Sequence, residues 1–132
     1  MSVHRATPEA ETATALFKIA QKFNDEYAQN DVEPVYDRWD LRSQAVISRA
    51  EYLRRHLECP AATQEPVRVL SATPSPGGQW SVRYEIGGLF FTDYWYYRGR
   101  RWVFDLLLSN PEAVRSYRLS GAKHARANGC RR

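Results

Sequence analysis

The chain has 132 residues, a formal net charge of +4, 43% hydrophobic residues and two cysteines. This length suits one domain with its own core, and two cysteines are too few for a disulfide scaffold. No apolar run could cross a bilayer and the N-terminus lacks a signal-peptide segment, so we expect no membrane partner and a cytoplasmic location.

The basic character belongs to the end of the chain. Five cations and no acid lie from Arg118 onward, whereas residues 1–117 carry 14 cations against 15 acids, a net charge of −1. Nucleic-acid binding requires a basic patch on a structured face. We therefore expect no nucleic-acid partner and a basic flexible tail over residues 121–132.

The first helix is predicted from a cap and a periodic apolar stripe. We expect residues 1–7 to be disordered and the domain to span residues 8–120. Thr7 is the predicted N-cap and Pro8 the first helical residue. Apolar residues then recur at helical spacing to about Ala28.

Two further helices are expected before the sheet. Asp31 can cap a short helix that tolerates Pro34 in its first turn. Residues 41–47 are predicted to be irregular. Ser48 and Glu51 form a capping box that begins a third helix, which should end near Cys59 because Pro60 follows.

Four strands and a short helix are predicted in the second half. Residues 67–72 form the first strand, and the aromatic-rich stretch from Gln79 to Leu108 forms three more, joined by short glycine-bearing breaks. Asn110 is expected to cap a final helix. The predicted class is α+β, with N-terminal helices packed on a curved, mainly antiparallel four-stranded sheet.

The parity of the last two strands predicts two apolar faces. An even loop near Gly99 places one set of side chains inside (Phe91, Asp93, Trp95, Tyr97, Trp102, Phe104 and Leu106) and a second set outside (Phe90, Thr92, Tyr94, Tyr96, Val103, Asp105 and Leu107). A three-residue loop with a bulge would reverse this pairing. The outer face needs cover, and a homodimer through Tyr94, Tyr96, Val103 and Leu107 is the expected source, with the C-terminal helix as the competing cover.

The chain resembles the nuclear transport factor 2-like superfamily of cone-shaped, cystatin-like α+β domains. The resemblance covers about residues 8–119 and rests on the long first helix, the segments 36–40 and 47–52, and the hairpin 94–105. It is nearest to the non-enzymatic bacterial members, including accessory domains of penicillin-binding transpeptidases. The superfamily also holds ketosteroid isomerases, dehydratases and polyketide cyclases, so the resemblance implies a cone with an internal pocket rather than one reaction.

Asp93 is the sharpest candidate for chemistry because it lies mid-strand among aromatic residues on the inner face. A carboxylate there is costly unless it is paired or protonated. It could be a general acid or base, with Tyr27, Tyr36 or Tyr97 donating to an oxyanion. The commoner alternative is a structural carboxylate bonded to an arginine, a tyrosine or a helix end.

The remaining pocket candidates follow from the expected arrangement of helices and sheet. We expect the ligand-binding wall to be aromatic, with one further acid (Phe23, Tyr36, Trp39, Asp40, Trp95, Tyr97, Trp102 and Phe104). Asp40 would face the mouth of the cone if the second helix lies as in the superfamily, or else cap a helix or loop. Asp105 is expected on the outer face beside a partner such as Arg83.

No metal and no cofactor are predicted. His56 and Cys59 lie three residues apart, but two ligands do not complete a zinc site. Cys59 is read as a small buried apolar residue and Cys130 as an inert or oxidation-prone tail residue. The glycine pairs lack the spacing of a nucleotide-binding loop.

Two functions remain open. The leading hypothesis is a non-catalytic domain that binds a small apolar ligand or acts as an interaction module. The alternative is a small-molecule isomerase, dehydratase or cyclase that uses Asp93 with a pocket tyrosine. An enzyme requires a solvent-reachable pocket in which Asp93 has a raised pKa, whereas an interaction domain can have its interior filled by aromatic side chains.

Overall fold

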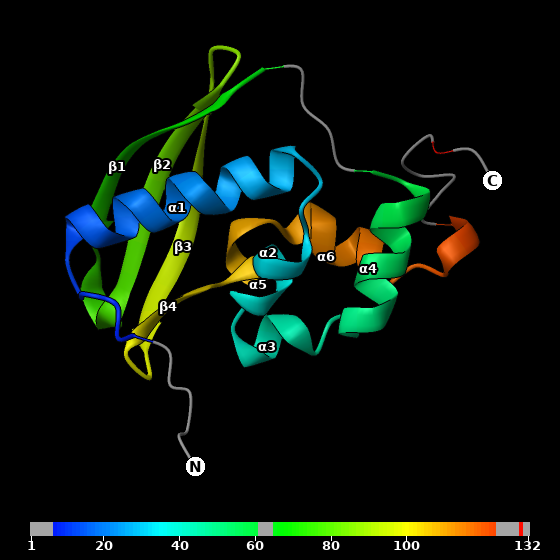
Figure 1. The fold of residues 1–132 in the computed structure, drawn as a ribbon, viewed down its shortest axis with the longest axis horizontal. Coiled ribbons are helices and arrows are strands. Elements are labelled where there is room, and N and C mark those ends of the chain that lie inside the picture. Colours follow the sequence, from blue (N-terminus) through cyan, green and yellow to red (C-terminus); the bar gives the residue numbers. More distant parts are fainter. Residues whose placement is uncertain (1–6, 61–64, 124–129, 131–132) are drawn as a thin grey trace.

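The computed structural model describes residues 7–60, 65–123 and 130, and its class is α+β. Four helices precede a four-stranded antiparallel sheet of order β1-β2-β3-β4, and two short helices follow it (Figure 1). The elements are α1 (Ala13–Ala28), α2 (Glu33–Asp37), α3 (Leu41–Gln44), α4 (Arg49–Glu58), β1 (Val67–Pro74), the 3₁₀ turn η1 (Pro76–Gly78), β2 (Gln79–Ile86), β3 (Leu89–Arg98), β4 (Arg101–Phe104), α5 (Leu106–Ser109) and α6 (Pro111–Tyr117). In the described part of the chain, the helices are too short or too polar to span a membrane.

Helix α1 begins later than the sequence predicts. Its N-cap is Thr12, whose side-chain oxygen accepts from the Ala15 N–H at 3.1 Å, so the prediction of Thr7 as cap is wrong. The preceding residues are held by the β3–β4 hairpin instead of forming a turn of helix. The Glu9 N–H donates to the Arg100 carbonyl at 2.9 Å, a long-range contact that local sequence does not reveal.

Side-chain caps determine where two of the three short helices between α1 and the sheet begin. Helix α4 starts as predicted, with the Ser48 hydroxyl accepting from the Glu51 N–H at 3.2 Å. Helix α2 has Val32 at its N-cap and no side-chain cap, so the assignment of Asp31 is wrong. The stretch predicted to be irregular contains α3, because the Asp40 carboxylate caps it by accepting from the Ser43 N–H at 2.9 Å.

The β3–β4 hairpin confirms the predicted face assignment. Arg98 pairs with Arg101, which leaves a two-residue loop in which Gly99 and Arg100 both have positive φ, 57° and 63°. An even loop keeps the pairing of faces that the alternation predicts. Asp93 therefore shares the inner face of the sheet with its cross-strand partner Val82.

The end of β4 differs from the prediction. The strand stops at Phe104, and Asp105 is the buried N-cap of α5, where its carboxylate accepts from the Leu108 N–H at 3.0 Å. Asp105 is thus not an outer-face residue beside Arg83. Leu107 belongs to α5 rather than to the outer face of the sheet. The capping preference of aspartate outweighs strand propensity at this point.

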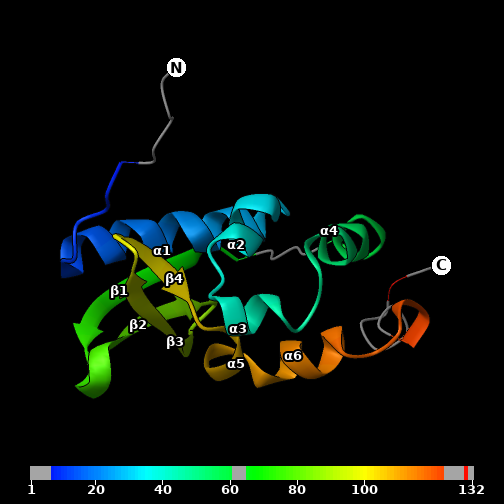
Figure 2. The ribbon, with the colours of Figure 1, turned by 90° about the horizontal axis from the view of Figure 1, so that it is seen from below.

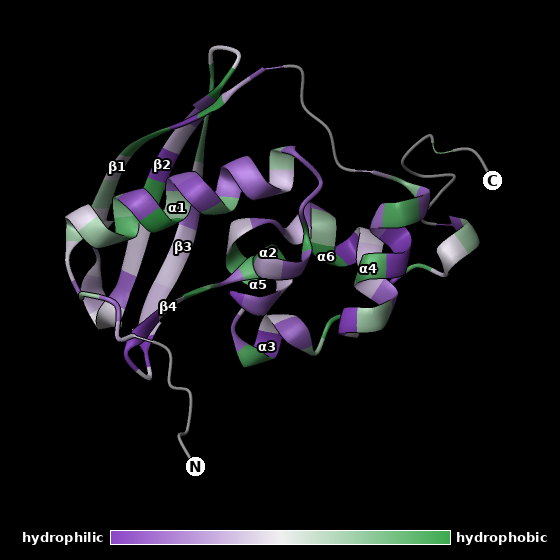
Figure 3. Ribbon diagram, in the orientation of Figure 1, coloured by the Kyte–Doolittle hydropathy of each residue, from purple (hydrophilic) through white to green (hydrophobic). Residues whose placement is uncertain are grey.

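One core joins the helices to the inner face of the sheet. Helix α1 lies across that face, with Leu16, Ala20 and Phe23 buried (Figures 1 and 2). Figure 3 shows α1 alternating between hydrophobic and hydrophilic residues, as expected for a helix with one packed side. Trp95 and Trp102 are fully buried at the centre of this core.

The C-terminal part of the chain is fastened to α4. The Arg55 guanidinium donates to the carbonyl oxygens of Tyr117 at 3.0 Å and Leu119 at 2.7 Å, and so satisfies the end of α6. Cys59 and Cys130 form a disulfide with Cα atoms 5.4 Å apart. The predictions of an apolar Cys59 and an unpaired Cys130 are therefore wrong. The disorder predicted for residues 1–6, 124–129, 131 and 132 concerns positions outside the described residues.

Candidate functional site

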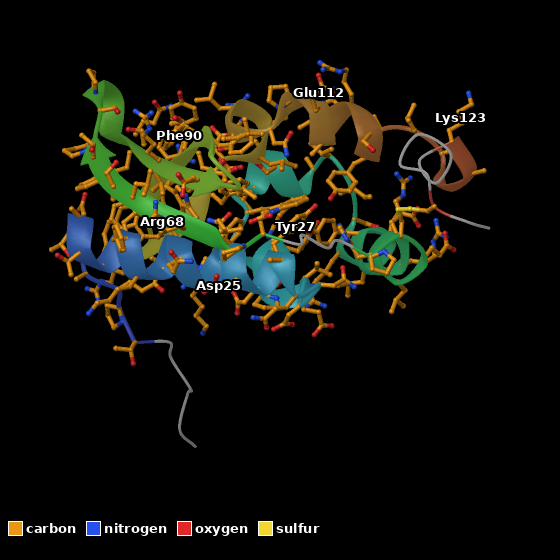
Figure 4. All side chains as sticks on the ribbon, turned by 90° about the horizontal axis from the view of Figure 1, so that it is seen from above. Asp25, Tyr27, Arg68, Phe90, Glu112 and Lys123 are labelled. Atoms are coloured by element: carbon orange, nitrogen blue, oxygen red, sulfur yellow. A yellow bond between two sulfur atoms is a disulfide. The ribbon has the colours of Figure 1, made fainter. Side chains whose placement is uncertain are left out.

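A cavity of about 90 Å³ lies between α1, the inner face of the sheet and the helices α4 to α6. Its wall is mainly aromatic and aliphatic and includes Asp93, two asparagines and four tyrosines (Phe23, Asn24, Tyr27, Val35, Trp39, Tyr52, Tyr84, Asp93, Phe104, Leu106, Asn110, Ala113 and Tyr117). Tyr27, near the C-terminal end of α1, lines the cavity and is 42% exposed (Figure 4). An apolar wall with a few polar groups is typical of small-molecule sites.

Asp93 is the acid of this cavity. It is 4% exposed, and burial raises the pKa of its carboxyl to about 7. The Tyr84 phenol beside the carboxyl lowers that pKa, but it does not offset the effect of burial. Of the structural partners expected for a buried carboxylate, the structure supplies the tyrosine.

Three further tyrosine hydroxyls gather on the helical side of the cavity. The Tyr27 and Tyr117 side chains lie close to one another in the wall. The Tyr52 hydroxyl lies near Tyr117 but, within the described part of the chain, makes no hydrogen bond of ordinary geometry. Desolvation raises the pKa of Tyr27, Tyr52, Tyr84 and Tyr117, so these phenols remain neutral hydrogen-bond donors at physiological pH.

His56 of α4 contacts two of these tyrosines. The ring nitrogen Nε2 of His56 and the Tyr117 hydroxyl are 3.0 Å apart and joined by a hydrogen bond. The His56 ring also packs against Tyr52, with 4.5 Å between ring centroids. Helix α4 therefore supplies one pocket tyrosine and orients another.

The structure brings five of the predicted site residues together. Asp93, Tyr27, Phe23, Trp39 and Phe104 all line the cavity. Phe23 packs against Phe104, with ring centroids 4.7 Å apart, and this contact joins α1 to β4. Four of these residues come from the first helix and the β3–β4 hairpin, where helical periodicity and strand alternation predicted which side chains face inward.

Five other predicted residues lie outside the cavity wall and have structural roles. The Tyr36 hydroxyl donates to the Ile47 carbonyl at 2.8 Å, and Asp40 caps α3. The Tyr97 hydroxyl donates to the Glu9 carbonyl at 2.6 Å, and the Trp102 indole N–H donates to the Ala10 carbonyl at 2.9 Å. Trp95 is fully buried in the core. Each of these side chains stabilises the fold around the site.

Sequence reasoning missed several residues of the wall. Tyr84 carried a usable signal, because it lies two residues from Val82 on the inner face of β2 and pairs across the strands with Phe91. Tyr52 and Tyr117 carried none beyond an apolar helical position. Their place in the wall depends on the tertiary packing of α4 and α6, which no local pattern specifies.

No family model matches the chain, and no curated protein or solved structure is significantly similar to it. The chemistry of the site must therefore be argued from its geometry. The arrangement offers one carboxyl that can carry a proton near neutral pH, several neutral phenol donors, and an otherwise apolar wall. Such a site can hold a small molecule that presents one polar group, and it can exchange a proton with that group.

Proposed function

We propose that this domain binds a small, predominantly apolar molecule in the cavity, with Asp93 as its polar anchor. One observation carries the proposal. Asp93 lies buried in the cavity wall with the Tyr84 phenol beside it, and burial raises the pKa of the Asp93 carboxyl to about 7. A carboxyl that lines a cavity and is uncharged below about pH 7 is placed to bind one polar group of a small, mainly apolar molecule.

The size and lining of the cavity favour a compact, uncharged group. A volume of about 90 Å³ holds several waters or the end of a small molecule. A protonated carboxyl both donates and accepts hydrogen bonds, so Asp93 suits a hydroxyl or carbonyl group below about pH 7. Asn24 and Asn110 add amide groups to the same wall.

This function agrees with the resemblance to the non-enzymatic members of the nuclear transport factor 2-like superfamily. Support for membership comes from the order of the elements, with helices followed by a four-stranded antiparallel sheet, and from a pocket between the first helix and the inner sheet face. A cone-shaped enclosure belongs to the same proposal. Trp95 and Trp102 would then fill the deep part of the interior and leave the Asp93 end for the ligand.

A second function, proton-transfer catalysis, is favoured by the pKa of Asp93. A general acid or base works best when its pKa lies near the operating pH, and that of Asp93 is about 7. A small-molecule isomerase, dehydratase or cyclase could use Asp93 to move the proton and a pocket phenol such as Tyr27 to bind the developing oxyanion. This second function requires the same pocket, and it requires turnover of the bound molecule in addition to binding.

The test compares three variants in ligand binding by NMR, with a panel of small neutral alcohols and ketones. Asp93→Leu removes the polar anchor and is expected to weaken binding about tenfold or more. Thr92→Asn, on the opposite face of the same strand, is the matched control and should bind as the wild type does. Unchanged binding by Asp93→Leu would overturn the proposal.

Asp93→Asn separates the two functions. An amide keeps a hydrogen-bonding group in the wall but cannot accept a proton. If the domain is a proton-transfer enzyme, this variant retains binding and loses the exchange of ketone α-protons with deuterated water. If neither the wild type nor the variant catalyses exchange, binding alone is the function.

A further inference from the structure

The inner face of β3 becomes steadily more exposed from the cavity toward the β2–β3 turn. Asp93 is 4% exposed, Phe91 is 41% exposed and Leu89 is 66% exposed. All three lie on the same face of the strand, because side chains two residues apart point the same way. An apolar strip therefore leads from the protein surface to the buried carboxyl.

The strip is continuous with the cavity wall. Tyr84 lines the cavity, and its ring stacks on that of Phe91, with centroids 5.4 Å apart and planes at 23°. Beyond this pair, Ile86 stands opposite Leu89 on the same face. From Asp93 to the turn, the inner-face residues of β2 and β3 are uncharged apart from Asp93 itself. We call Tyr84, Ile86, Leu89 and Phe91 the apolar shelf.

The opposite face of the same hairpin has a different character. Arg83 and Glu85 stand opposite Thr92 and Phe90, and the Arg83 guanidinium lies 5.0 Å from the centre of the Phe90 ring. Figure 4 shows Phe90 on the side of the sheet away from α1. Phe90 thus stacks with a charged neighbour and lies apart from the cavity, whereas the shelf is continuous with the cavity wall.

We propose that the ligand is amphipathic, with a compact neutral polar group that enters the cavity and an apolar body that lies on the apolar shelf. This inference rests on the proposed binding function and extends it to a class of ligand. The cavity is too small to hold a large apolar body, and an exposed apolar strip that runs into it provides the area for one. Leu89 lies four residues from Asp93, about 13 Å along an extended strand. A linear or ring-based apolar body of about that length can lie along the shelf.

The experiment uses 1-alkanols from butanol to octanol, with affinity measured by NMR titration of the whole chain. Butanol tests the cavity, and the longer alcohols test the shelf. A fully buried methylene strengthens binding by up to about fourfold. Because the shelf is open to solvent on one side, we expect the affinity to rise only about twofold for each methylene added beyond butanol.

Variants of the hairpin separate the shelf from the cavity. Leu89→Ser should reduce the gain per methylene and leave butanol affinity unchanged. Phe91→Ser should also reduce the gain per methylene, and it removes the ring that stacks on Tyr84 of the cavity wall. Phe90→Ser, at the adjacent outer-face position, is the matched control and should leave the whole series unchanged. Of the two shelf variants, Leu89→Ser should disturb folding less, because Leu89 is the most exposed residue of the strip.

Each contrary outcome has a distinct meaning. If butanol binds but longer alcohols gain nothing, the ligand class is wrong and the proposed function stands. If the series gains affinity through Leu89 but Asp93→Leu has no effect, the shelf binds apolar chains and the proposed role of Asp93 fails. If Leu89→Ser or Phe91→Ser instead dissociates an oligomer, the shelf is an interface between copies and the inference is overturned. If no alcohol binds at all, both proposals fall.

Discussion

Tyr84 and Asp93 lie beside one another on the inner face of adjacent strands, and the Tyr84 phenol lowers the pKa of the buried Asp93 carboxyl, against the larger effect of burial. Tyr84 is two residues from Val82, the direct cross-strand partner of Asp93, so the two side chains share the inner face at diagonal positions. A phenol satisfies a carboxyl in either protonation state without fixing its charge. The pair therefore leaves Asp93 able to titrate near neutral pH.

Asp93 should make stability fall with rising pH. Its pKa is about 7 in the folded protein against an ordinary value of 3.8, so the folded state holds the proton more tightly than the unfolded chain does. The resulting stabilisation is fully present below about pH 4 and is lost as pH rises through 7. A shift of this size corresponds to a few kcal/mol, at most about 4.

Asp93→Asn should remove that dependence, because an amide does not titrate. Urea unfolding of both proteins at pH 5 and pH 8 measures it. The wild type should lose more unfolding free energy than Asp93→Asn between the two pH values. Equal losses in the two proteins would show that Asp93 does not titrate in this range.

Tyr84→Phe should raise the pKa of Asp93 further. The tyrosine hydrogen bond favours the ionised carboxyl, and its loss leaves burial unopposed by that donor. The midpoint of the pH-dependent stability change should move to higher pH. Tyr97→Phe is the matched control, since the Tyr97 hydroxyl donates to the Glu9 carbonyl instead. It should cost about 1 kcal/mol of stability and leave the midpoint in place.

Arg55 and Arg54 should differ sharply in their contribution to stability. Both bind Glu51, but only Arg55 is buried and donates to the carbonyl oxygens that end α6. Arg55→Met leaves those carbonyls without this donor and should lower the unfolding free energy by about 2–3 kcal/mol. Arg54→Met removes solvent-screened ion pairs with Glu51 and Glu58 and should cost less than about 1 kcal/mol. Similar losses for the two variants, measured by urea unfolding, would contradict this role of Arg55.

The homodimer stays a prediction, and it now rests on Tyr94, Tyr96 and Val103, because Leu107 lies in α5. These three residues are half-buried in the single chain, and Tyr96 has the Arg98 guanidinium 4.5 Å above its ring. Tyr96→Lys would place a second cation beside Arg98 and should dissociate a dimer formed through this face. Sedimentation velocity measures the change. A wild-type monomer at tens of micromolar would contradict the prediction.

The sequence predicted those elements whose cause is local. The capping box at Ser48 and the Asn110 cap each begin a helix where expected. The two-residue loop at Gly99 kept the alternation in register, so Asp93 could be assigned to the inner face before the structure was known. The assignment of Asp93 to the inner face thus followed from the two-residue alternation of side chains along the strands and from the length of one turn.

Failures came from long-range contacts. Thr7 has the sequence features of a helix cap. The Glu9 N–H instead donates to the Arg100 carbonyl, and the helix begins only after its N-cap Thr12. Tyr52 and Tyr117 join the cavity wall only because side chains of α4 and α6 meet, and their ring centroids lie 5.4 Å apart. The disulfide of Cys59 with Cys130 spans 71 residues, a separation at which spacing carries no information.

The most direct test is a pH titration of the side-chain carboxyl carbon of Asp93 by ¹³C NMR. The carboxyl lies in an apolar wall with a tyrosine as its partner, so its resonance should move with a midpoint near pH 7 and respond to an alcohol bound in the cavity. A midpoint near the ordinary value of 3.8, with no response to any alcohol, would mean that Asp93 is a solvated or charge-compensated residue and that the cavity is not a binding site.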